Sequence, residues 1–569
     1  MPTLKTRPTT ESNTLSDLPD WLARILTSRG VQQLSELEFD FKQMPSPEQM
    51  LGAVAAAEVL ADAIAQQARI LIIADYDVDG ATSCTLVKQS LELLGAQNVG
   101  YLVPDRFKLG YGLSPAVVEL ALEFTPDWLI TVDNGIASVA GVRAAKAAGL
   151  GVIVTDHHLP GNELPEADVI VNPSQPGCTF PTKALAGVGV AFYVMLALRQ
   201  ELRRRDWFKS QSTAEPNLAQ MLDLVALGTV ADLVPLDHLN RLLVKQGLKR
   251  INQGLTRPGI KTILQLARGE TEEVVAQDMG FAVAPRLNAA GRLDDMTLGI
   301  ECLLSQTAAG ALPLAERLND WNVERREIQQ TMENEASNIA QSQAISDSTY
   351  TISLYSDNWH EGVVGLVASK IKDHYYRPTV VFAPAEQAGL IKGSARSIKG
   401  IHIRDALDAV ATRAPDVLQK CGGHAMAAGL TIEAQHLKAF SALFETVVQE
   451  VAEPETFDNV LWTDGELPAI ALNLDTAQLI RHYGPWGQKF PEPLFEGTFR
   501  VLDTYVLKQR HLKFRLQTSA GKVIDAIAFN LSDDILSRHF EQIHIAYRLN
   551  VNHFRGQSKA QLMIEHIVS

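Results

Sequence analysis

Short apolar runs alternate with helical stretches between residues 69 and 155. Four of the runs have the length and the β-branched content of buried strands, and the segments between them have the apolar spacing of helices. Because parallel strands need a crossover helix between them, this alternation predicts a doubly wound parallel sheet. The predicted strands are 69–74, 99–103, 128–132 and 151–155, and the helices follow Gly80, Ser114 and Ile136.

Helices are also predicted outside this sheet. One is expected around Trp21–Leu26, and the capping box at Ser46–Gln49 predicts another that runs to about Gln67. Residues 311–345 have a high density of helix formers and predict one long helix. At about 1.5 Å per residue it would span on the order of 50 Å, which is enough to bridge two domains.

The second half of the chain changes character twice. Residues 350–450 repeat the strand and helix alternation on a smaller scale, which predicts a second α/β unit. After residue 453, strand-like runs are separated by turns and carry basic residues, which favours an OB-like barrel that follows a nucleic-acid strand. These runs are 499–506, 512–517, 523–529 and 543–551, and the basic residues are Lys508, Arg510, His511, Lys513 and Arg515.

We therefore expect five parts, each with its own pattern. They are a polar lead-in (1–45), the parallel-sheet domain (46–310), the bridging helix (311–345), the smaller α/β domain (346–453) and the OB-like barrel (457–569). A chain of 569 residues with 46% hydrophobic residues is long enough for several cores, which agrees with this division.

Composition narrows the cellular setting. The four cysteines show no C-x-x-C spacing, which argues against a disulfide framework and a structural zinc site and favours a reducing cytoplasm. No apolar leader or long apolar run supports secretion or contact with a membrane. A net charge of -15 usually counts against nucleic-acid binding, but aspartates that gather around cations would account for part of it.

Three aspartates at alternate positions follow the first predicted strand. Asp75, Asp77 and Asp79 lie at its carboxyl end, where open α/β sheets place their ligands. Carboxylates this close repel one another, and a divalent cation would remove that cost. A calcium loop of the EF-hand type would need a Glu where Leu86 stands, and a helix instead of a strand before it. A solvated acidic turn is the remaining alternative for this segment alone.

Similar side chains follow the other strands. Asp133 comes after the strand at 128–132, and His157 and His158 come after the strand at 151–155. Asp232 follows a helical stretch at 222–230. Each one alone is more often a turn or surface feature, but together they predict one crevice. Several Asp with one or two His suit two Mn²⁺ or Mg²⁺ ions that share a carboxylate, and such pairs drive displacement at phosphorus.

At this point a set of motifs resembles the DHH phosphoesterase superfamily and, within it, the RecJ group of single-strand-specific exonucleases. The resemblance covers nearly the whole chain, and the motifs occur in the same order and spacing. They are DYDVDG (75–80), PDRFKLGYGLS (104–114), TVDNG (131–135), DHH (156–158), ADLVPL (231–236), PRLNAAGRL (285–293), GSARS (393–397) and GGHAMAAG (422–429).

This resemblance implies a 5′-3′ exonuclease that degrades single-stranded DNA to 5′-mononucleotides in DNA repair and recombination. A single-strand-binding protein and a helicase are the implied partners, and two Mn²⁺ or Mg²⁺ ions are the cofactors. The expected metal ligands, with Asp133 as the bridge, are Asp75, Asp77, Asp79, Asp133, His157 and Asp232. The expected catalytic residues are Asp79, Asp133, His157 and His158. The expected substrate-binding residues are Arg106, Tyr111, Arg286, Asn288, Ser394, Arg396 and His424.

Two other functions share these motifs. A DHH phosphodiesterase for short oligonucleotides or cyclic dinucleotides would need no OB-like barrel to follow a long strand. A catalytically inactive replication scaffold would have lost metal ligands, and here none is missing. One loop, residues 484–491, departs from the family pattern because Lys489-Phe490 replaces the commoner Gly-Asn. The sequence leaves its role open.

Overall fold

The computed structural model describes residues 2–9, 15–106, 108–269, 273–343, 345–346, 348–418, 420–554 and 556–568. The chain divides into two compact units. The larger contains Thr6–Asn319 and Trp462–Ser569, and the smaller contains Met1–Lys5 and Asp320–Leu461. Among the described residues, no helix is both long and apolar enough to cross a membrane.

A five-stranded parallel sheet forms the centre of the larger unit, in the order β3-β2-β4-β5-β6. Its strands are β2 (Ile70–Ala74), β3 (Val99–Leu102), β4 (Trp128–Val132), β5 (Gly151–Thr155) and β6 (Val169–Val171). The sequence predicted the first four, and missed β6 because it is only three residues long. The chain adds β3 on one side of β2 and β4 on the other, so the order reverses between β2 and β4. Ligands of open α/β sheets bind at such a reversal.

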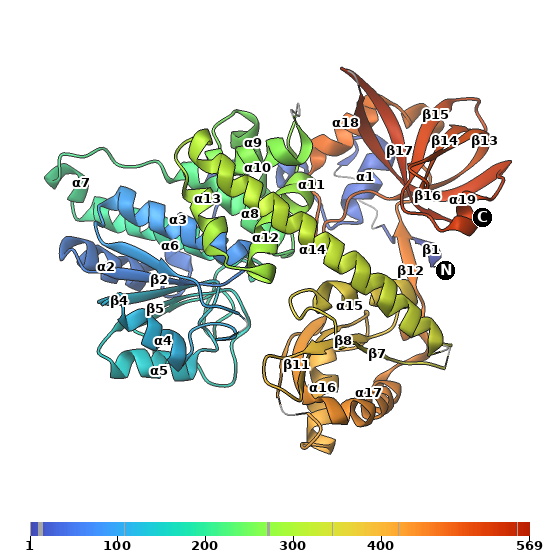
Figure 1. The fold of residues 1–569 in the computed structure, drawn as a ribbon. Coiled ribbons are helices and arrows are strands. Elements are labelled where there is room, and N and C mark those ends of the chain that lie inside the picture. Colours follow the sequence, from blue (N-terminus) through green and yellow to red (C-terminus); the bar gives the residue numbers. More distant parts are fainter. Residues whose placement is uncertain are drawn as a thin grey trace. The chain divides into compact units, whose positions relative to one another are not determined.

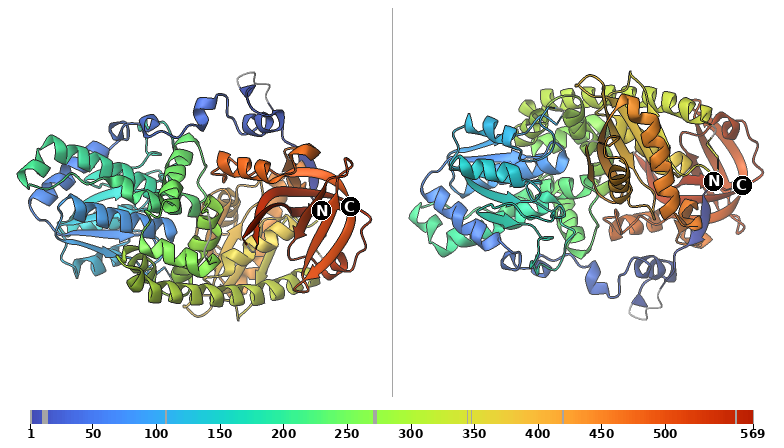
Figure 2. Two further views of the ribbon diagram at one scale, coloured as in Figure 1. Left: turned by 90° about the horizontal axis from the view of Figure 1, so that it is seen from above. Right: turned by 90° about the horizontal axis from the view of Figure 1, so that it is seen from below.

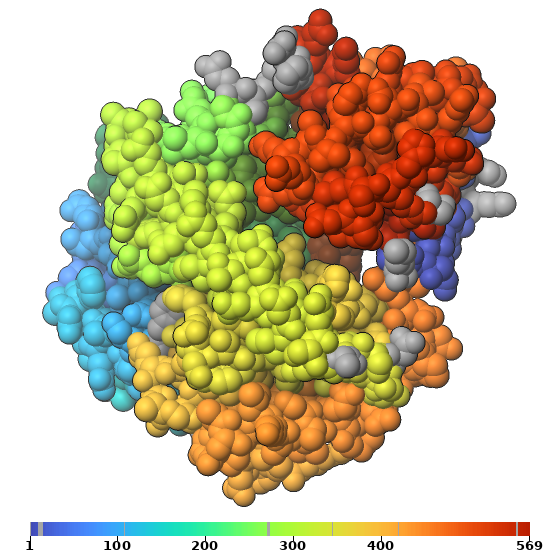
Figure 3. Space-filling model, turned by 45° about the vertical axis from the view of Figure 1, so that its right-hand side comes forward, coloured from blue at the N-terminus to red at the C-terminus, as the bar shows by residue number. Residues whose placement is uncertain are grey.

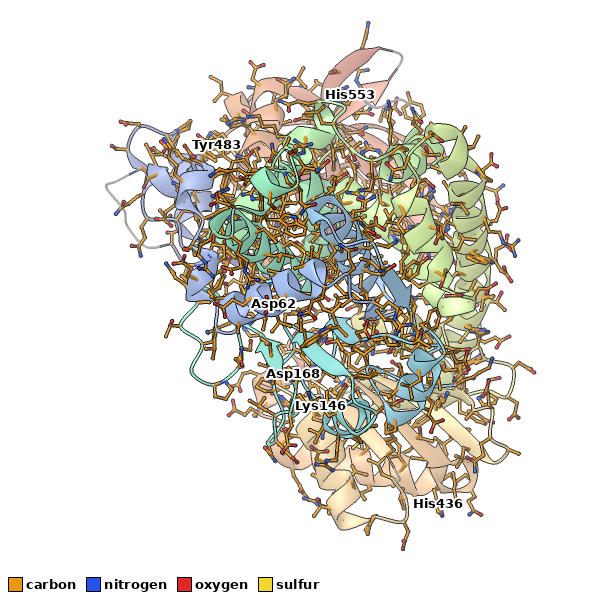
Figure 4. The ribbon with its side chains drawn as sticks, turned by 90° about the vertical axis from the view of Figure 1, so that its left-hand side faces the viewer. Asp62, Lys146, Asp168, His436, Tyr483 and His553 are labelled. Atoms are coloured by element: carbon orange, nitrogen blue, oxygen red, sulfur yellow. The ribbon has the colours of Figure 1, made fainter. Side chains whose placement is uncertain are left out.

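Helices cover both faces of this sheet, which confirms the predicted doubly wound fold (Figure 1). One face is covered by α2 (Ala53–Ala65), α3 (Val78–Leu94) and α6 (Gly187–Arg204), and the other by α4 (Pro115–Leu122) and α5 (Val139–Ala147). Alternate strand residues such as Leu71 and Val152 pack against α4 and α5, because successive side chains of a strand point to opposite faces. At the sheet edge, Lys146 of α5 reaches Asp168 before β6 at 2.7 Å (Figure 4).

The helix predicted from Ser46 begins later than the capping box suggests. Pro47–Gln49 forms only a 3₁₀ turn capped by Ser46, and α2 starts at Ala53. Between them Gly52 has a left-handed backbone (φ 85°), and a Cβ there would lie 2.1 Å from the carbonyl oxygen of Ile170. The prediction of one helix was wrong because close packing against β6 requires a glycine turn at this point.

Helices make up the rest of this part of the larger unit. They are α1 (Asp20–Thr27), α7 (Trp207–Ser210), α8 (Leu222–Ala231), α9 (His238–Asn252), α10 (Pro258–Arg268), α11 (Ala276–Asp278), the π-helical turn η6 (Met279–Val283), α12 (Ala284–Leu293) and α13 (Thr297–Leu304). Short 3₁₀ turns are η2 (Leu34–Leu37), η3 (Phe41–Gln43) and η5 (Leu218–Met221). The helix α8 ends at Ala231, directly before Asp232 and one residue later than the sequence predicted.

The predicted long helix is α14 (Ala308–Ser342), which begins in the larger unit and ends in the smaller one. It is one continuous rod (Figure 2). In the smaller unit a mixed five-stranded sheet has the order β10-β11-β9-β8-β7. Its strands are β7 (Ile352–Tyr355), β8 (Thr379–Pro384), β9 (Leu390–Arg396), β10 (Lys420–Gly423) and β11 (Ala427–Glu433), and its helices are α15 (Val364–Tyr375), α16 (Ile403–Arg413) and α17 (Leu437–Val451). Phe382, Phe440 and Phe444 lie at the centre of its core.

The C-terminal strands close into a barrel in the order β13-β14-β15-β17-β16. The strands are β13 (Phe495–Leu507), β14 (His511–Gln517), β15 (Val523–Ala528), β16 (Gln542–Phe554) and β17 (Gln557–Ile567). The sequence did not predict β17, because this strand begins with polar residues. Smaller elements are β1 (Thr3–Thr6), η8 (Pro454–Phe457), β12 (Val460–Thr463), η9 (Ala469–Ala471), α18 (Leu474–Tyr483) and α19 (Asp533–Leu536).

A buried ion pair connects the segment that follows α1 to the start of the barrel segment. Arg29 Nη1 lies 2.7 Å from Asp464 Oδ1, and the exposed fractions of the two side chains are 0% and 2%. Arg29 Nε also donates to the carbonyl oxygen of Pro491 at 2.6 Å, and Asp464 accepts the backbone N–H of Leu494. From Thr6 onward, the polar lead-in belongs to the same compact unit as the barrel and the parallel sheet.

The loop 484–491 also connects the barrel segment to the helical part of the larger unit. Its Trp486 and Phe490 rings stack at 5.1 Å, and the guanidinium of Arg241 on α9 lies 4.1 Å from the Phe490 ring centre. The carbonyl oxygen of Gln488 accepts the backbone N–H of Leu236 at 2.8 Å. The loop thus packs on the segment that follows Asp232, and Phe490 supplies apolar contact there.

Candidate active site

The three alternate aspartates lie at the turn from β2 into α3. Asp77 is the N-cap of α3, since its Oδ1 accepts the backbone N–H groups of Asp79 (2.9 Å) and Gly80 (3.1 Å). The helix therefore begins at Val78, two residues before Gly80, after which the sequence placed it. A Cβ on Gly80 would lie 2.4 Å from the carbonyl oxygen of Asp75, so only glycine permits this tight turn.

Asp79 is held from the other side by the start of α6. Its two carboxylate oxygens accept the backbone N–H groups of Gly187 (2.6 Å) and Val188 (2.9 Å). A helix N-terminus favours negative charge, so this contact stabilises the ionised carboxylate. Gly187 and Gly228 bring α6 and α8 close, because a Cβ at either position would lie within 2.8 Å of a site aspartate. Neither glycine nor the two amides was predicted from the sequence; the signal at Gly187 and Val188 was the glycine-rich start of an apolar helix.

Asp133 follows β4 with a left-handed backbone (φ 60°), which is uncommon for a residue other than glycine. The neighbouring Asn134 donates to the carbonyl oxygens of Ile73 (3.1 Å) and Val132 (2.9 Å), and thereby ties the ends of β2 and β4 together. The hydroxyl of Tyr111 donates to the carbonyl oxygen of Asp133 at 3.1 Å. These contacts fix the Asp133 carboxylate at the reversal of the strand order.

His157 lies among three carboxylates from different elements. Its Nε2 is 3.1 Å from Asp133 Oδ1, 3.5 Å from Asp232 Oδ2 and 3.9 Å from Asp79 Oδ2. The side chain is 12% exposed. The ends of β4, β5 and α8 therefore meet at one point, as the sequence analysis expected of successive strand ends.

Asp156 orients both histidines and was not among the predicted site residues. Its Oδ1 accepts the backbone N–H groups of His157 (2.7 Å) and His158 (3.1 Å) and lies 2.7 Å from His158 Nδ1. Its Oδ2 accepts the backbone N–H of Ile136 at 2.9 Å. The signal for this role was an acid directly before two histidines.

Asp156 also sets the charge of His158. Burial alone would lower the pKa of His158, but the hydrogen bond and the charge of Asp156 outweigh it and raise that pKa to about 9. Burial would raise the pKa of Asp156, yet the bond from His158 holds it below its usual value. The pair is therefore an imidazolium and a carboxylate near neutral pH.

The donors fall into three groups that could each hold a metal ion. These are Asp75, Asp77, Asp133; Asp133, His157, His158; and Asp79, His157, Asp232, with the ligand atoms of each group within 4.8 Å of one another. Asp133 belongs to two groups, which suits a bridging carboxylate.

The electrostatics of these groups fit a cation. Burial raises the pKa values of Asp75, Asp79, Asp133 and Asp232, and repulsion from neighbouring aspartates raises them further. Asp75 Oδ1 is buried and accepts no hydrogen bond from the described residues. Divalent cations would neutralise the repulsion and give that oxygen a partner, and Asp with His donors suits Mn²⁺ or Mg²⁺.

Two predicted substrate-binding residues lie beside this cluster. The guanidinium of Arg106 is 4.5 Å from the ring centre of Tyr76 and donates to the carbonyl oxygen of Gly291 at 3.3 Å. Tyr111 contacts both Asp133 and His158, whose Nδ1 lies 3.2 Å from the tyrosine hydroxyl. The structure therefore brings a cation and a phenol to the edge of the candidate metal groups.

The helix α12 carries two more of the predicted residues. Gly291 lets α12 approach the loop after β2, since a Cβ there would lie 2.1 Å from the carbonyl oxygen of Tyr76. Asn288 lies one turn earlier on the same face. Arg286 is buried instead, and it donates to the Ala282 carbonyl and to Asn319. Its visible contacts join α12 to the start of α14.

The remaining predicted residues gather in the smaller unit. Ser394 and Arg396 lie on β9, and Arg396 Nη1 donates to Ser394 Oγ at 2.8 Å. Ser394 pairs with Gly429 of β11, and α15 lies against the two side chains, because a Cβ on Gly365 would lie 2.9 Å from Ser394 Oγ and 2.7 Å from Arg396 Nη2. His424 begins the turn between β10 and β11, and its N–H donates to the Ala427 carbonyl.

Comparisons with known proteins agree with this geometry. The sequence matches the DHH family, N-terminal domain, at residues 69–229, the DHHA1 domain at 347–450 and the RecJ OB domain at 463–566. It is 47% identical to the single-stranded-DNA-specific exonuclease RecJ of Dickeya dadantii, covering 99% of this chain and 98% of the relative. The RecJ of Escherichia coli is 46% identical over 97% of this chain and 96% of its own. The crystal structure of RecJ in complex with Mn²⁺ from Thermus thermophilus superposes with a TM-score of 0.78 at 29% identity, over 97% of this chain and 76% of that one.

Proposed function

Because the chain belongs to the RecJ family of single-stranded-DNA-specific exonucleases, we propose that it hydrolyses single-stranded DNA from the 5′ end and releases 5′-mononucleotides. The observation that carries the proposal is the convergence of Asp79, Asp133, His157 and Asp232 at one reversal of a parallel sheet. The closed C-terminal barrel favours a long strand over a short oligonucleotide or a cyclic dinucleotide. The complete donor set counts against an inactive scaffold.

We propose that Asp75, Asp77, Asp79, Asp133, His157 and Asp232 would hold the metal ions, with Asp133 as the carboxylate shared between two of the donor groups. The chemistry that Mn²⁺ or Mg²⁺ supplies when bound is activation of water and neutralisation of phosphate charge. The amides of Gly187 and Val188 hold Asp79 in place, and Asp156 holds both histidines. The positive charge of His158 would stabilise charge that develops on the phosphoryl oxygens.

Incubation with DNA that is labelled at one end tests the activity, the polarity and the cofactor together. We expect a 5′-labelled single strand to release labelled mononucleotide at once in Mn²⁺ or Mg²⁺, whereas a 3′-labelled strand shortens stepwise. Duplex DNA and samples with EDTA should remain intact. Release of labelled mononucleotide first from the 3′ end would contradict the polarity, and cleavage in EDTA would contradict the metal site.

The setting of this reaction is a further part of the proposal. We place the enzyme in the cytoplasm, in DNA repair and recombination, beside a single-strand-binding protein that covers its substrate and a helicase that supplies it. The resemblance and the four cysteines without disulfide spacing support this setting.

Selection of the 5′ end requires groups that recognise a terminal phosphate. A terminal phosphate carries more negative charge than an internal diester, so guanidinium groups would favour it. We propose that Arg106, Ser394 and Arg396 bind it, with Tyr111, Asn288 and His424 contacting the neighbouring nucleotides. Arg286 is kept as a weaker candidate, since it contacts Ala282 and Asn319.

Arg396→Ala should lower the preference for a 5′-phosphorylated over a 5′-hydroxyl strand by about tenfold, the scale of one lost charged contact. The ratio of kcat/KM on the two substrates measures it. Arg413→Ala is the matched control, because Arg413 is exposed in the same unit and pairs with Glu450. If Arg396→Ala weakens both substrates equally, Arg396 contacts an internal phosphate and has no role at the end.

A further inference from the structure

Tyr76 lies between two candidate metal ligands in the chain but is not itself one of the predicted site residues. It is half-buried, and its neighbours are Asp75 and Asp77. The motif at 75–80 directed attention to the aspartates, because carboxylates are the groups that hold a cation. The ring of Tyr76 instead contacts Arg106 and Tyr111, which are both residues expected to bind the DNA.

The first of these contacts places a cation over the ring of Tyr76. Arg106 Cζ lies 4.5 Å from the ring centre, a distance at which a guanidinium is attracted to the electrons of an aromatic ring. Arg106 Nη1 also donates to the carbonyl oxygen of Gly291 at 3.3 Å. The ring contact uses none of the N–H groups of the guanidinium as a conventional hydrogen-bond donor. It therefore restrains the cation without taking a donor from a phosphate.

The backbone of Tyr76 is held by the helix that carries Gly291. A Cβ on Gly291 would lie 2.1 Å from the carbonyl oxygen of Tyr76, so α12 packs directly on the turn between β2 and α3. The helices α12 and α13 also contact α3, and on the face shown in Figure 3 the blue part of the larger unit borders its yellow-green helices. Tyr76 and Gly291 thus form two sides of a clamp around Arg106, which we call the arginine clamp.

The second contact of Tyr76 connects the clamp to the candidate metal groups. The ring centres of Tyr76 and Tyr111 lie 6.3 Å apart with the planes at 82°, and those of Tyr111 and His158 lie 5.7 Å apart at 72°. Aromatic rings favour such edge-to-face arrangements at these separations. The Tyr111 hydroxyl also donates to the carbonyl oxygen of Asp133. A continuous series of side-chain contacts therefore joins Arg106 to two residues of the metal groups.

We propose that Tyr76 is a positioning residue, which holds the Arg106 guanidinium ready for the terminal 5′-phosphate and fixes it relative to the metal groups. The inference rests on the proposed function and adds a residue to its recognition of the strand end. Arg106 lies in the loop after β3, and a long arginine side chain has several rotatable bonds. A binding group that is already held in place loses less conformational entropy when its ligand arrives. The ring of Tyr76 supplies that restraint.

Tyr76→Leu should lower the ratio of kcat/KM on 5′-phosphorylated over 5′-hydroxyl strands about fivefold, the factor that corresponds to one partly buried cation–π contact. The change should lie in KM for the phosphorylated strand, with kcat on the hydroxyl strand unchanged. Anisotropy in EDTA should show the same loss of affinity for the phosphorylated strand without turnover. Tyr76→Phe keeps the ring and should keep the ratio. Phe124→Leu is the control, because Phe124 is a ring exposed after α4 in the same unit.

Combining Tyr76→Leu with Arg106→Ala gives the decisive result. If the ring acts through Arg106, the double variant should have the same ratio as Arg106→Ala alone. A further fall in the double variant would overturn the inference, and so would an unchanged ratio in Tyr76→Leu or an equal loss on both strands, which a merely structural role predicts. Wild type without a preference for the 5′-phosphate would also overturn it and leave the exonuclease function intact. Failure of wild type to degrade single strands would instead contradict the proposed function.

Discussion

Asp79→Ala should reduce kcat on single-stranded DNA at least about a thousandfold in either Mn²⁺ or Mg²⁺. This reduction is larger than the usual effect on kcat of removing one group that stabilises charge. Asp79 is 1% exposed and shares a donor group with His157 and Asp232, so no neighbouring carboxylate can take its place. The variant should also bind Mn²⁺ more weakly, which titration calorimetry measures without reference to activity. Glu92→Ala is the matched control, since Glu92 is a carboxylate on the same helix that pairs with Lys88 at the surface.

Two effects on stability oppose each other in this variant. Loss of a buried, repelled carboxylate favours folding, whereas the amides of Gly187 and Val188 lose their acceptor. We therefore expect the free energy of unfolding to change by no more than about 2 kcal/mol, and circular dichroism should show a folded protein. A folded Asp79→Ala variant with near wild-type turnover in Mn²⁺ would exclude Asp79 as a ligand.

The second large effect is expected for Asp156→Ala. The Asp156 carboxylate accepts the backbone N–H groups of both His157 and His158. Its removal leaves three backbone N–H donors without their acceptor and frees the ring of His158. Loss of a residue that orients metal ligands typically costs about 10- to 100-fold in metal affinity or activity, and we expect the upper end here.

The pH dependence separates orientation from simple unfolding. In the metal-free protein the pKa of His158 is raised to about 9, so its pair with Asp156 stabilises the fold fully below 6.5 and loses that contribution as the pH rises through 9. In Asp156→Asn the His158 pKa, followed by nuclear magnetic resonance, should fall toward the ordinary value. A folded Asp156→Asn protein with an unchanged His158 pKa and full Mn²⁺ affinity would show that Asp156 has no orienting role.

The sequence was sufficient for four of the five strands of the parallel sheet because their signals are local. The strands at 128–132 and 151–155 are short, apolar and β-branched, and the structure has them at the same residues. The polar residues that follow them converge because parallel strands end at one edge. Local signals failed where a distant contact decides the outcome. The capping box at Ser46 could not reveal that Ile170 forces a glycine turn at Gly52.

The same limit explains the loop 484–491. Lys489 has a left-handed backbone (φ 58°), the conformation that favours glycine, and this gives a reason why glycine is commoner at that position. The sequence could not show that Phe490 packs against Arg241, more than two hundred residues earlier. The orienting role of Asp156 was missed for a different reason. In the sequence, an acid directly before two histidines could equally well be a further metal ligand.

The ion pair between Arg29 and Asp464 has a consequence for the exchange of parts between relatives. The barrel looks like a detachable module in the sequence, and a chimera would naturally be joined near residue 460. Such a chimera would inherit Asp464 from one parent and Arg29 from the other, and any mismatch would bury a lone charge at a cost of about 3–5 kcal/mol. Barrels should therefore be transplanted together with the first thirty or so residues, and the two ends of the gene should evolve as one inheritable unit.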